Sequence, residues 1–257
     1  MKKVLALISA AILSVACLAA CGSSAGSNTS SAADSSAKET LTMATNAEFP
    51  PYEYYDGDKV VGIDAEIAQL IADKLGMNLE IVDVAFESIV PGVQAGKYDM
   101  GMAGMTVNEE RLQSVNFSSS YATGVQVVIV KEDGPIASLD DISGKMIGVQ
   151  TNTTGDIYAS GDYGDEYVTR YDNGALAVEG LKSGKVDCVI IDNEPAKAYV
   201  AANEGLKILD TKYAIEDYAI CFAKENTALQ EKVNGALEEL VADGSVQKII
   251  DKYISAD

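Results

Sequence analysis

Histidine is absent from this chain of 257 residues. Its absence removes the commonest metal ligand and the usual base of nucleophilic catalysis. Cysteine is scarce, and of the four cysteines only Cys188 and Cys221 lie beyond the N-terminal segment. Each sits in an apolar run, so we predict two separate buried thiols rather than a disulfide or a zinc site. Because no calcium-loop or phosphate-loop spacing occurs either, we expect no metal and no cofactor. Composition leaves carboxylate-only acid–base catalysis open, but no pair of acids indicates it, and we expect no catalytic residue.

Positive charge is also in short supply. The chain has 19 lysines and arginines against 39 acids, which gives a formal net charge of −20. This excess of acid argues against nucleic acid or an anionic membrane surface as a partner, and its ordinary meaning is solubility. The hydrophobic fraction of 47% is typical of a globular protein, and the length allows one large domain or two smaller ones.

The N-terminus carries a short apolar run that is too short to form a stable membrane span. A basic start, "MKK", precedes "VLALISAAILSVACL", and the run ends in "LAAC" at residues 18–21. This ending resembles the bacterial lipobox, which implies that residues 1–20 are a lipoprotein signal peptide and that Cys21 is acylated, with palmitate-type chains. The alternative is an ordinary signal peptide that ends near a cysteine. Cys17 lacks the small-residue context and would leave with the signal.

A segment of small polar residues follows Cys21. Residues 22–40 cannot bury a core, and a flexible chain of that length spans about 25 Å on average. We therefore expect residues 21–40 to tether a folded domain to the cell membrane on its extracytoplasmic face. No later segment is apolar and long enough to span the membrane, so the lipid is the expected anchor.

Strand patterns alternate with helix patterns from residue 40 onward, which favours an α/β fold. Residues 62–76 predict a helix with Asp64 as its N-cap and Gly76 at its end. Its apolar face carries Ile67, Leu70, Ile71 and Leu75. The next predicted elements are a strand at 78–84, a short helix at 86–96 and a strand at 99–105. The C-terminal part predicts two amphipathic helices broken at Gly244.

An internal repeat links two distant parts of the chain. "VPGVQAGKYDMGMAG" (90–104) and "VEGLKSGKVDCVIID" (178–192) share V-x-G and then G-K-x-D in one register. Each predicts a helix, a turn and a strand, and the strands end at Gly104 and Asp192. Because ligands in open α/β sheets bind beyond the carboxyl ends of strands, we expect these two ends to face each other across a cleft.

Arg111 stands where a helix start disfavours a cation. Asn108 predicts an N-cap, and Glu109 and Glu110 fill the first turn, where an acid contributes up to about 1 kcal/mol. One interpretation is that Arg111 binds the carboxylate of a ligand. The other is structural, with the arginine paired to Glu110 or another acid.

A polar turn offers further donors for an anion. "KMIGVQ" (145–150) predicts a strand, and "TNTTG" then leads into a helix capped by Thr153 or Thr154, whose first N–H groups are open to an anion. Ordinary helix capping is the alternative. A free amino acid would use both sets of groups, because its carboxylate suits a guanidinium with N–H donors and its ammonium suits an acid such as Asp192.

Several segments, taken in order, resemble the amino-acid-binding lipoproteins of ABC importers, in the type II periplasmic binding protein superfamily (solute-binding family 3). These segments are "ATNAEFPPYEY", "VVGIDAEIAQLIADKLG", "AGMTVNEER" with "NFSSSY", "IGVQTNTTG", "GKVDCVIIDN" and "DGSVQKIIDKY". The resemblance covers nearly all of residues 40–257. It implies a monomer with two α/β lobes, each a mixed sheet flanked by helices, joined by two crossover strands. Lobe 1 would comprise 40–123 and 219–257, and lobe 2 would comprise 124–218. The implied partners are a free L-amino acid and a permease with its ATPase.

The resemblance also implies a set of ligand-binding residues. The carboxylate-binding arginine falls on Arg111, and the amine-binding acid falls on Asp192. Backbone and hydroxyl contacts fall on Gly104, Thr106, Thr154 and Gly155. Phe49 would stack on the ligand side chain, with Phe86 opposite, and Asn46 would lie beside that side chain.

Asn46 stands where many members of the family carry an aspartate. With Glu48 taken as the only local acid, and pointing to solvent, we predict a ligand with a polar uncharged or small apolar side chain. Two other functions stay open: an enzyme that resembles the cyclohexadienyl dehydratases, and a ligand-sensing module. We expect a binding protein and not an enzyme.

Overall fold

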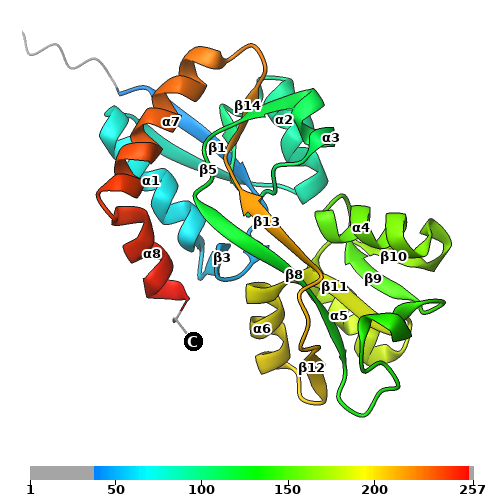
Figure 1. Cartoon of the computed structure of the whole chain (residues 1–257). Helices are drawn as coiled ribbons and strands as arrows, with labels where there is room; N and C mark the ends of the chain where they lie inside the picture. The colour runs from blue at the N-terminus through cyan, green and yellow to red at the C-terminus, as the bar shows by residue number, and fades with distance from the viewer. Residues whose placement is uncertain (1–37, 255–257) are drawn as a thin grey trace, which may run out of the picture. The chain divides into compact units, whose positions relative to one another are not determined.

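The computed structural model describes residues 38–254. The predicted signal peptide, Cys21 and almost all of the predicted tether lie outside these residues. The described part holds mixed sheets flanked by helices, which confirms the predicted α/β fold (Figure 1). None of its helices combines the length and the apolar character needed to cross a membrane.

The first sheet has the strand order β5-β1-β6-β14-β7. Its strands are β1 (Thr40–Thr45), β5 (Asn78–Asp83), β6 (Met100–Gly101), β7 (Val115–Phe117) and β14 (Cys221–Ala223). One core cluster joins the sheet to α1 (Ile63–Leu75), α7 (Thr227–Ala242) and α8 (Ser245–Tyr253). Another lies against α2 (Ile89–Gln94). The short elements nearby are β2 (Glu48–Phe49), β3 (Glu53–Asp56), β4 (Lys59–Val61), the 3-10 turn η1 (Phe86–Ser88) and α3 (Glu109–Ser114).

The second sheet has the order β10-β9-β11-β8-β12, and β13 pairs with β8 beside this path. Its strands are β8 (Ala122–Lys131), β9 (Ile147–Gln150), β10 (Val168–Tyr171), β11 (Cys188–Asp192), β12 (Leu206–Ile208) and β13 (Ala214–Tyr218). Its helices are α4 (Thr154–Tyr163), α5 (Gly174–Ser183) and α6 (Asn193–Ala202), with the 3-10 turns η2 (Leu139–Ile142) and η3 (Asp165–Tyr167).

Strand alternation gives the second sheet a core on each face. Along β8, Val127 and Ile129 enter one cluster, whereas Val128 and Val130 enter the other, because successive side chains of a strand point to opposite faces. Both faces are therefore apolar and covered.

Two long strands run between the sheets. β8 and β13 pair antiparallel from Ala122 opposite Tyr218 to Gln126 opposite Ala214, and they lie side by side in Figure 1. They lead the chain into the second sheet and back to the first. The division into lobes at residues 123–124 and 218–219 stays a prediction.

Most of the local predictions are confirmed, but two are wrong. Gly76 ends α1 in the left-handed conformation with φ 69°, as expected. Asp64 is not its N-cap, because Gly62 holds that position and the buried Asp64 carboxylate accepts a hydrogen bond from the Gly104 N–H instead, at 2.8 Å. The strand predicted at 99–105 is short, since β6 ends at Gly101.

Both copies of the repeat are a helix, a turn and a strand, as predicted. α2 leads to β6 and α5 leads to β11, and Gly96 and Gly184 occupy the turns with φ of 68° and 76°. Glycine is required there because side chains disfavour this left-handed region. Cys188 and Cys221 are buried free thiols, as predicted.

Candidate ligand-binding site

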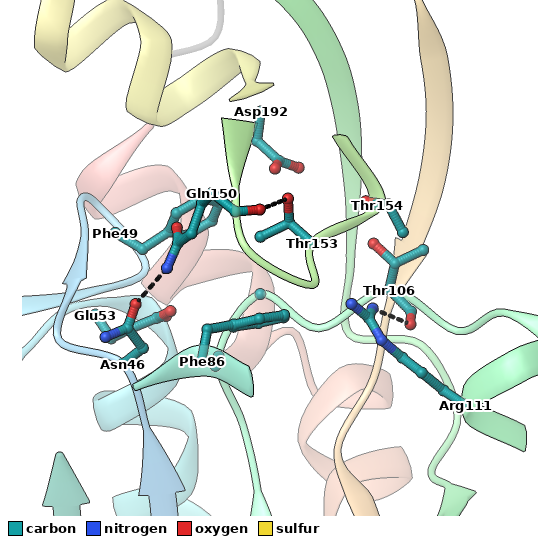
Figure 2. Close-up of a pocket in the computed structure, with 12 residues that line it drawn as sticks. Asn46, Phe49, Glu53, Phe86, Thr106, Arg111, Gln150, Thr153, Thr154 and Asp192 are labelled. Carbon is teal, nitrogen blue, oxygen red and sulfur yellow. Dashed lines mark hydrogen bonds between the residues drawn. The ribbon is translucent and has the colours of Figure 1, made fainter. Parts of the chain in front are cut away.

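A pocket lies where residues of both sheets meet (Figure 2). All of the predicted ligand-binding residues line it except Gly155. The lining residues are Asn46, Phe49, Glu53, Phe86, Ala103, Gly104, Thr106, Arg111, Gln150, Thr153, Thr154 and Asp192. Gly155 lies in the first turn of α4, where an added Cβ would stand 3.0 Å from the Ile190 carbonyl oxygen.

Arg111 is held at the first turn of α3, which confirms the predicted cap. The Asn108 side chain accepts a hydrogen bond from the Arg111 N–H at 2.8 Å. The guanidinium lies 5.3 Å from the centre of the Phe86 ring. It donates from Nη1 to the Thr106 carbonyl at 2.8 Å and from Nη2 to the Asn152 carbonyl at 3.0 Å. Backbone from both sheets therefore orients the charge.

No acid of the described residues lies close enough to this arginine to form an ion pair. Arg111 is 8% exposed, and within residues 38–254 its guanidinium forms no ion pair. Burial lowers its pKa from the ordinary value. Glu110 is exposed and forms no ion pair with Arg111, and Glu216, Asp192 and Glu110 act on the guanidinium only as nearby charges. A buried cation without a counter-charge is costly, and it favours an anion in the pocket.

The start of α4 lies beside this cation. Thr153 is the N-cap, and its hydroxyl accepts from the Asp156 N–H at 3.4 Å and donates to the Gln150 carbonyl at 2.9 Å. Of the two threonines offered by the sequence, Thr153 therefore caps the helix, and the buried Thr154 lines the pocket. The helix start adds a partial positive charge near Arg111.

Asp192 supplies the negative group of the pocket. It ends β11, is 8% exposed and accepts a hydrogen bond from Gln126 Nε2 at 2.8 Å. The Tyr218 hydroxyl donates to its other oxygen. Burial, and then the neighbouring Glu216 carboxylate, raise the pKa of Asp192 to about 7. Such a carboxylate gains from a cation that restores its charge.

Glycine is needed at the end of the first repeat copy. Gly104 has φ 51°, and a Cβ there would stand 2.8 Å from the Phe49 ring. The Phe49 ring in turn packs against Tyr52, with ring centres 5.8 Å apart. Gly104 therefore lets the chain turn close under an aromatic wall of the pocket.

The far end of the pocket is polar. In Figure 2, Arg111 lies at one end of the view and Asn46 and Glu53 at the other, with Phe86 between them. Gln150 Nε2 donates to Asn46 Oδ1 at 2.9 Å, and Asn46 Nδ2 donates to the Val84 carbonyl at 3.1 Å. These bonds use much of the hydrogen-bonding capacity of Asn46.

Glu53 is the acid that the sequence argument missed. It is 1% exposed and lines the pocket, and neither carboxylate oxygen accepts a hydrogen bond from an N–H or hydroxyl donor of the described residues; its near neighbour is the Asp64 carboxyl group. Burial and the neighbouring Asp64 hold its pKa well above the usual range. Glu48 is exposed, as predicted, and accepts a hydrogen bond from Asn173 at 3.1 Å, but taking it as the only local acid is wrong, because Glu53 lines the pocket. The pairing of Phe49 with Glu53 across β2 and β3 explains the error, since directly opposite residues share one face.

Comparison with known proteins identifies the family. The model for bacterial extracellular solute-binding proteins, family 3, matches residues 41–256, and the chain belongs to this family. The arginine-binding extracellular protein ArtP of Bacillus subtilis (strain 168) is 34% identical over 228 residues, which cover 86% of this chain and 89% of that protein.

Solved structures agree with the family. An ancestral arginine-binding protein bound to glutamine has a TM-score of 0.80 at 40% identity, over 85% of this chain and 99% of that one. The arginine-, lysine-, histidine-binding protein ArtJ of Geobacillus stearothermophilus has a TM-score of 0.81 at 31% identity, over 85% and 96%. The chain thus has the fold of amino-acid-binding proteins, and its relatives are binding proteins of ABC transporters.

Proposed function

We propose that this protein is an extracytoplasmic lipoprotein that captures a free L-amino acid and delivers it to the permease and ATPase of an ABC importer. One observation carries the proposal: a buried guanidinium without an acid partner and a buried carboxylate, Arg111 and Asp192, line one small pocket. The α-carboxylate and the α-ammonium of an amino acid complement these two charges. The protein acts as a monomer and catalyses no reaction.

The proposed ligand contacts are those implied by the family resemblance. They are Asn46, Phe49, Phe86, Gly104, Thr106, Arg111, Thr154, Gly155 and Asp192. The two lobes, 40–123 with 219–257 and 124–218, close on the ligand about the crossover strands. Hydrogen bonds that join the two sheets across the pocket, such as Gln150 to Asn46, support this closure.

The ligand side chain is proposed to be cationic, of the arginine type. Glu53 supports this choice over the neutral ligand that the sequence predicted, because a guanidinium can satisfy both of its unpartnered oxygens. The relatives named for arginine support it independently.

A thermal-shift screen of the twenty amino acids and cystine tests the function. A ligand at 100 times its Kd adds about 2.7 kcal/mol to the free energy of unfolding. This corresponds to a rise in Tm of about 5–10 °C for a domain of this size. We expect L-arginine to give the largest rise. If none of them raises Tm, the proposed function is wrong. If glutamine, serine, alanine or cystine binds at least tenfold more tightly than arginine and lysine, the neutral-ligand prediction is correct.

The lipid anchor is tested by replacing Cys21, which lies outside the described residues. We expect Cys21→Ser to abolish acylation, so that the protein is released or is retained only through an uncleaved signal. The measurement is membrane fractionation with metabolic labelling by a fatty acid. Cys17→Ser is the matched control and should be lipidated normally. Cys21→Ser protein of mature length in the membrane fraction would contradict the lipobox prediction.

A further inference from the structure

A second buried carboxylate lies behind the pocket. Glu216, on β13, is 4% exposed and is not among the residues that line the pocket. Its Oε2 accepts a hydrogen bond from Gln126 Nε2 at 2.9 Å, and its Oε1 has no partner. Burying a carboxylate is costly unless its oxygens are hydrogen-bonded or its charge is compensated.

Gln126 joins this carboxylate to the pocket. From β8, its side-chain nitrogen lies 2.8 Å from Asp192 Oδ2, 2.9 Å from Glu216 Oε2 and 3.3 Å from the Thr154 hydroxyl. An amide nitrogen carries two hydrogens, so the two carboxylates take both of them. One neutral amide therefore bridges two acids that would otherwise repel each other.

The groups around the two acids do not neutralise them. Arg111 from α3 and Tyr218 from β13 face Glu216 electrostatically, and Tyr158 from α4 faces it both as a nearby dipole and as a hydrogen-bond donor. Asp192 faces these three groups together with Tyr52 and Glu53 from the first part of the chain. Burial, with the nearby carboxylates, raises the pKa of Tyr158 to about 12, and the pKa of Tyr218 lies well above its usual range. Arg111 is thus the one cation among the described groups that face this pair, and the proposed function gives it to the α-carboxylate.

We propose that Glu216 determines the selectivity of the pocket for a positively charged α-amino group, acting through Gln126 and Asp192 rather than by touching the ligand. The proposal rests on the proposed function. Two acids that share one amide hold more negative charge than their surroundings neutralise. An α-ammonium on Asp192 supplies the missing charge, whereas a neutral α-hydroxyl in the same place leaves both acids uncompensated. Glu216 is thus a positioning residue for the amine.

The unliganded protein gives the first test, with Glu216→Gln and the control Asp217→Asn. The introduced glutamine keeps the shape of the side chain and can donate to Gln126 Oε1, which has no partner. Asp217 is exposed on the same strand and loses the same charge. Because the folded-state pKa of Asp192 is raised, the folded protein binds a proton more tightly there, and stability is lost as pH rises from about 4 through about 7. We expect Glu216→Gln to reduce this loss, so that its Tm exceeds that of the wild type by a few degrees at pH 8 and by nothing at pH 5.

Ligand binding gives the second test, by calorimetry with L-arginine, L-glutamine and the α-hydroxy analogue of each between pH 5 and pH 8. Wild-type affinity for the amino acid should rise with pH as Asp192 ionises near pH 7. In Glu216→Gln we expect affinity at pH 8 to fall about tenfold, the equivalent of one pKa unit. The midpoint of the affinity profile should move to lower pH, and preference over the hydroxy analogue should decrease. Asp217→Asn should match the wild type.

The outcomes separate this role from a structural one and from the proposed function. Equal losses for the amino acid and its hydroxy analogue, with an unchanged pH profile, would make Glu216 a structural residue and overturn the proposal. Unchanged affinity and selectivity in Glu216→Gln would overturn it as well. A wild-type protein that binds no amino acid would overturn both the proposed function and this role, and the unliganded pH dependence of Tm would then report only the coupling of the two acids.

Discussion

Replacing Arg111 by lysine should weaken amino-acid binding far more than the preserved charge suggests. The guanidinium donates to two backbone carbonyls, of Thr106 and Asn152, and still has N–H groups to offer a carboxylate. A lysine keeps one point charge but cannot serve both carbonyls and a bidentate ligand from one position. Removing one partner of a buried charge pair typically costs about 2–5 kcal/mol, so we expect Kd to rise at least about thirtyfold.

Isothermal titration calorimetry on Arg111→Lys and Arg111→Ala measures this loss. Arg170, the other arginine of the chain, is the matched control, because it pairs with Asp156 and Asp165 and is not among the residues that line the pocket. Arg170→Lys should change Kd less than about threefold, because weakening a partly exposed ion pair changes the free energy by less than about 1 kcal/mol. Unchanged affinity in folded Arg111→Ala would refute the proposed carboxylate site. Unfolding of Arg111→Ala, checked by circular dichroism, would leave Arg111→Lys to decide.

Replacing Glu53 by glutamine should change which ligand binds best. If Glu53 pairs with a cationic side chain, Glu53→Gln should weaken arginine binding about thirtyfold or more, the lower end of the cost of losing one partner of a buried charge pair. Glutamine as a ligand carries no side-chain charge, so its affinity should change less than tenfold. The side chain is fully buried and lies beside Asp64, and its neutral replacement should not destabilise the unliganded fold.

Glu48→Gln is the control for this change. Glu48 is exposed and bonds to Asn173, outside the pocket, so arginine affinity should be unaffected. Competition calorimetry with arginine and glutamine on both variants measures the two affinities. If arginine affinity falls in Glu48→Gln and not in Glu53→Gln, the acid that reads the ligand side chain has been assigned to the wrong residue.

Short-range chemistry made much of the fold predictable. The capped helix at Asn108, the left-handed glycines at 96 and 184 and the break at Gly244 follow from the conformational needs of those residues. The repeat was informative because both of its copies end at the pocket, at Gly104 just beyond β6 and at Asp192, the last residue of β11. The position of Asp64 was not predictable, since its partners Gly104 and Tyr121 lie about 40 and 57 residues along the chain.

The polar end of the pocket required three-dimensional pairing. Gln150 reads as an ordinary last residue of a strand, and only the structure brings it to Asn46. Glu53 could have been found by placing it opposite Phe49 in the short hairpin. Glu216 lies on a strand with exposed neighbours on both sides, and its burial depends on Gln126 of the adjacent strand. Local sequence patterns therefore predicted the charged residues Arg111 and Asp192 of the pocket, but not Gln150, Glu53 and Glu216, whose positions depend on pairing between distant segments.

Tyr218 contacts residues of both sheets, and this limits which segments two related proteins can exchange without loss of function. Its ring lies in the first core cluster, 5.2 Å from the Tyr52 ring, while its hydroxyl holds Asp192 of the second sheet. A Cβ at Gly124 would collide with that hydroxyl. Gly124, Asp192 and Tyr218 fall within residues 124–218, but Tyr52 does not. Consider a chimera that takes residues 124–218 from one relative and the rest of the chain from another. We expect Tyr218 to hold Asp192 correctly in such a chimera only where both parents have the same residue at position 52, because that residue packs against the Tyr218 ring.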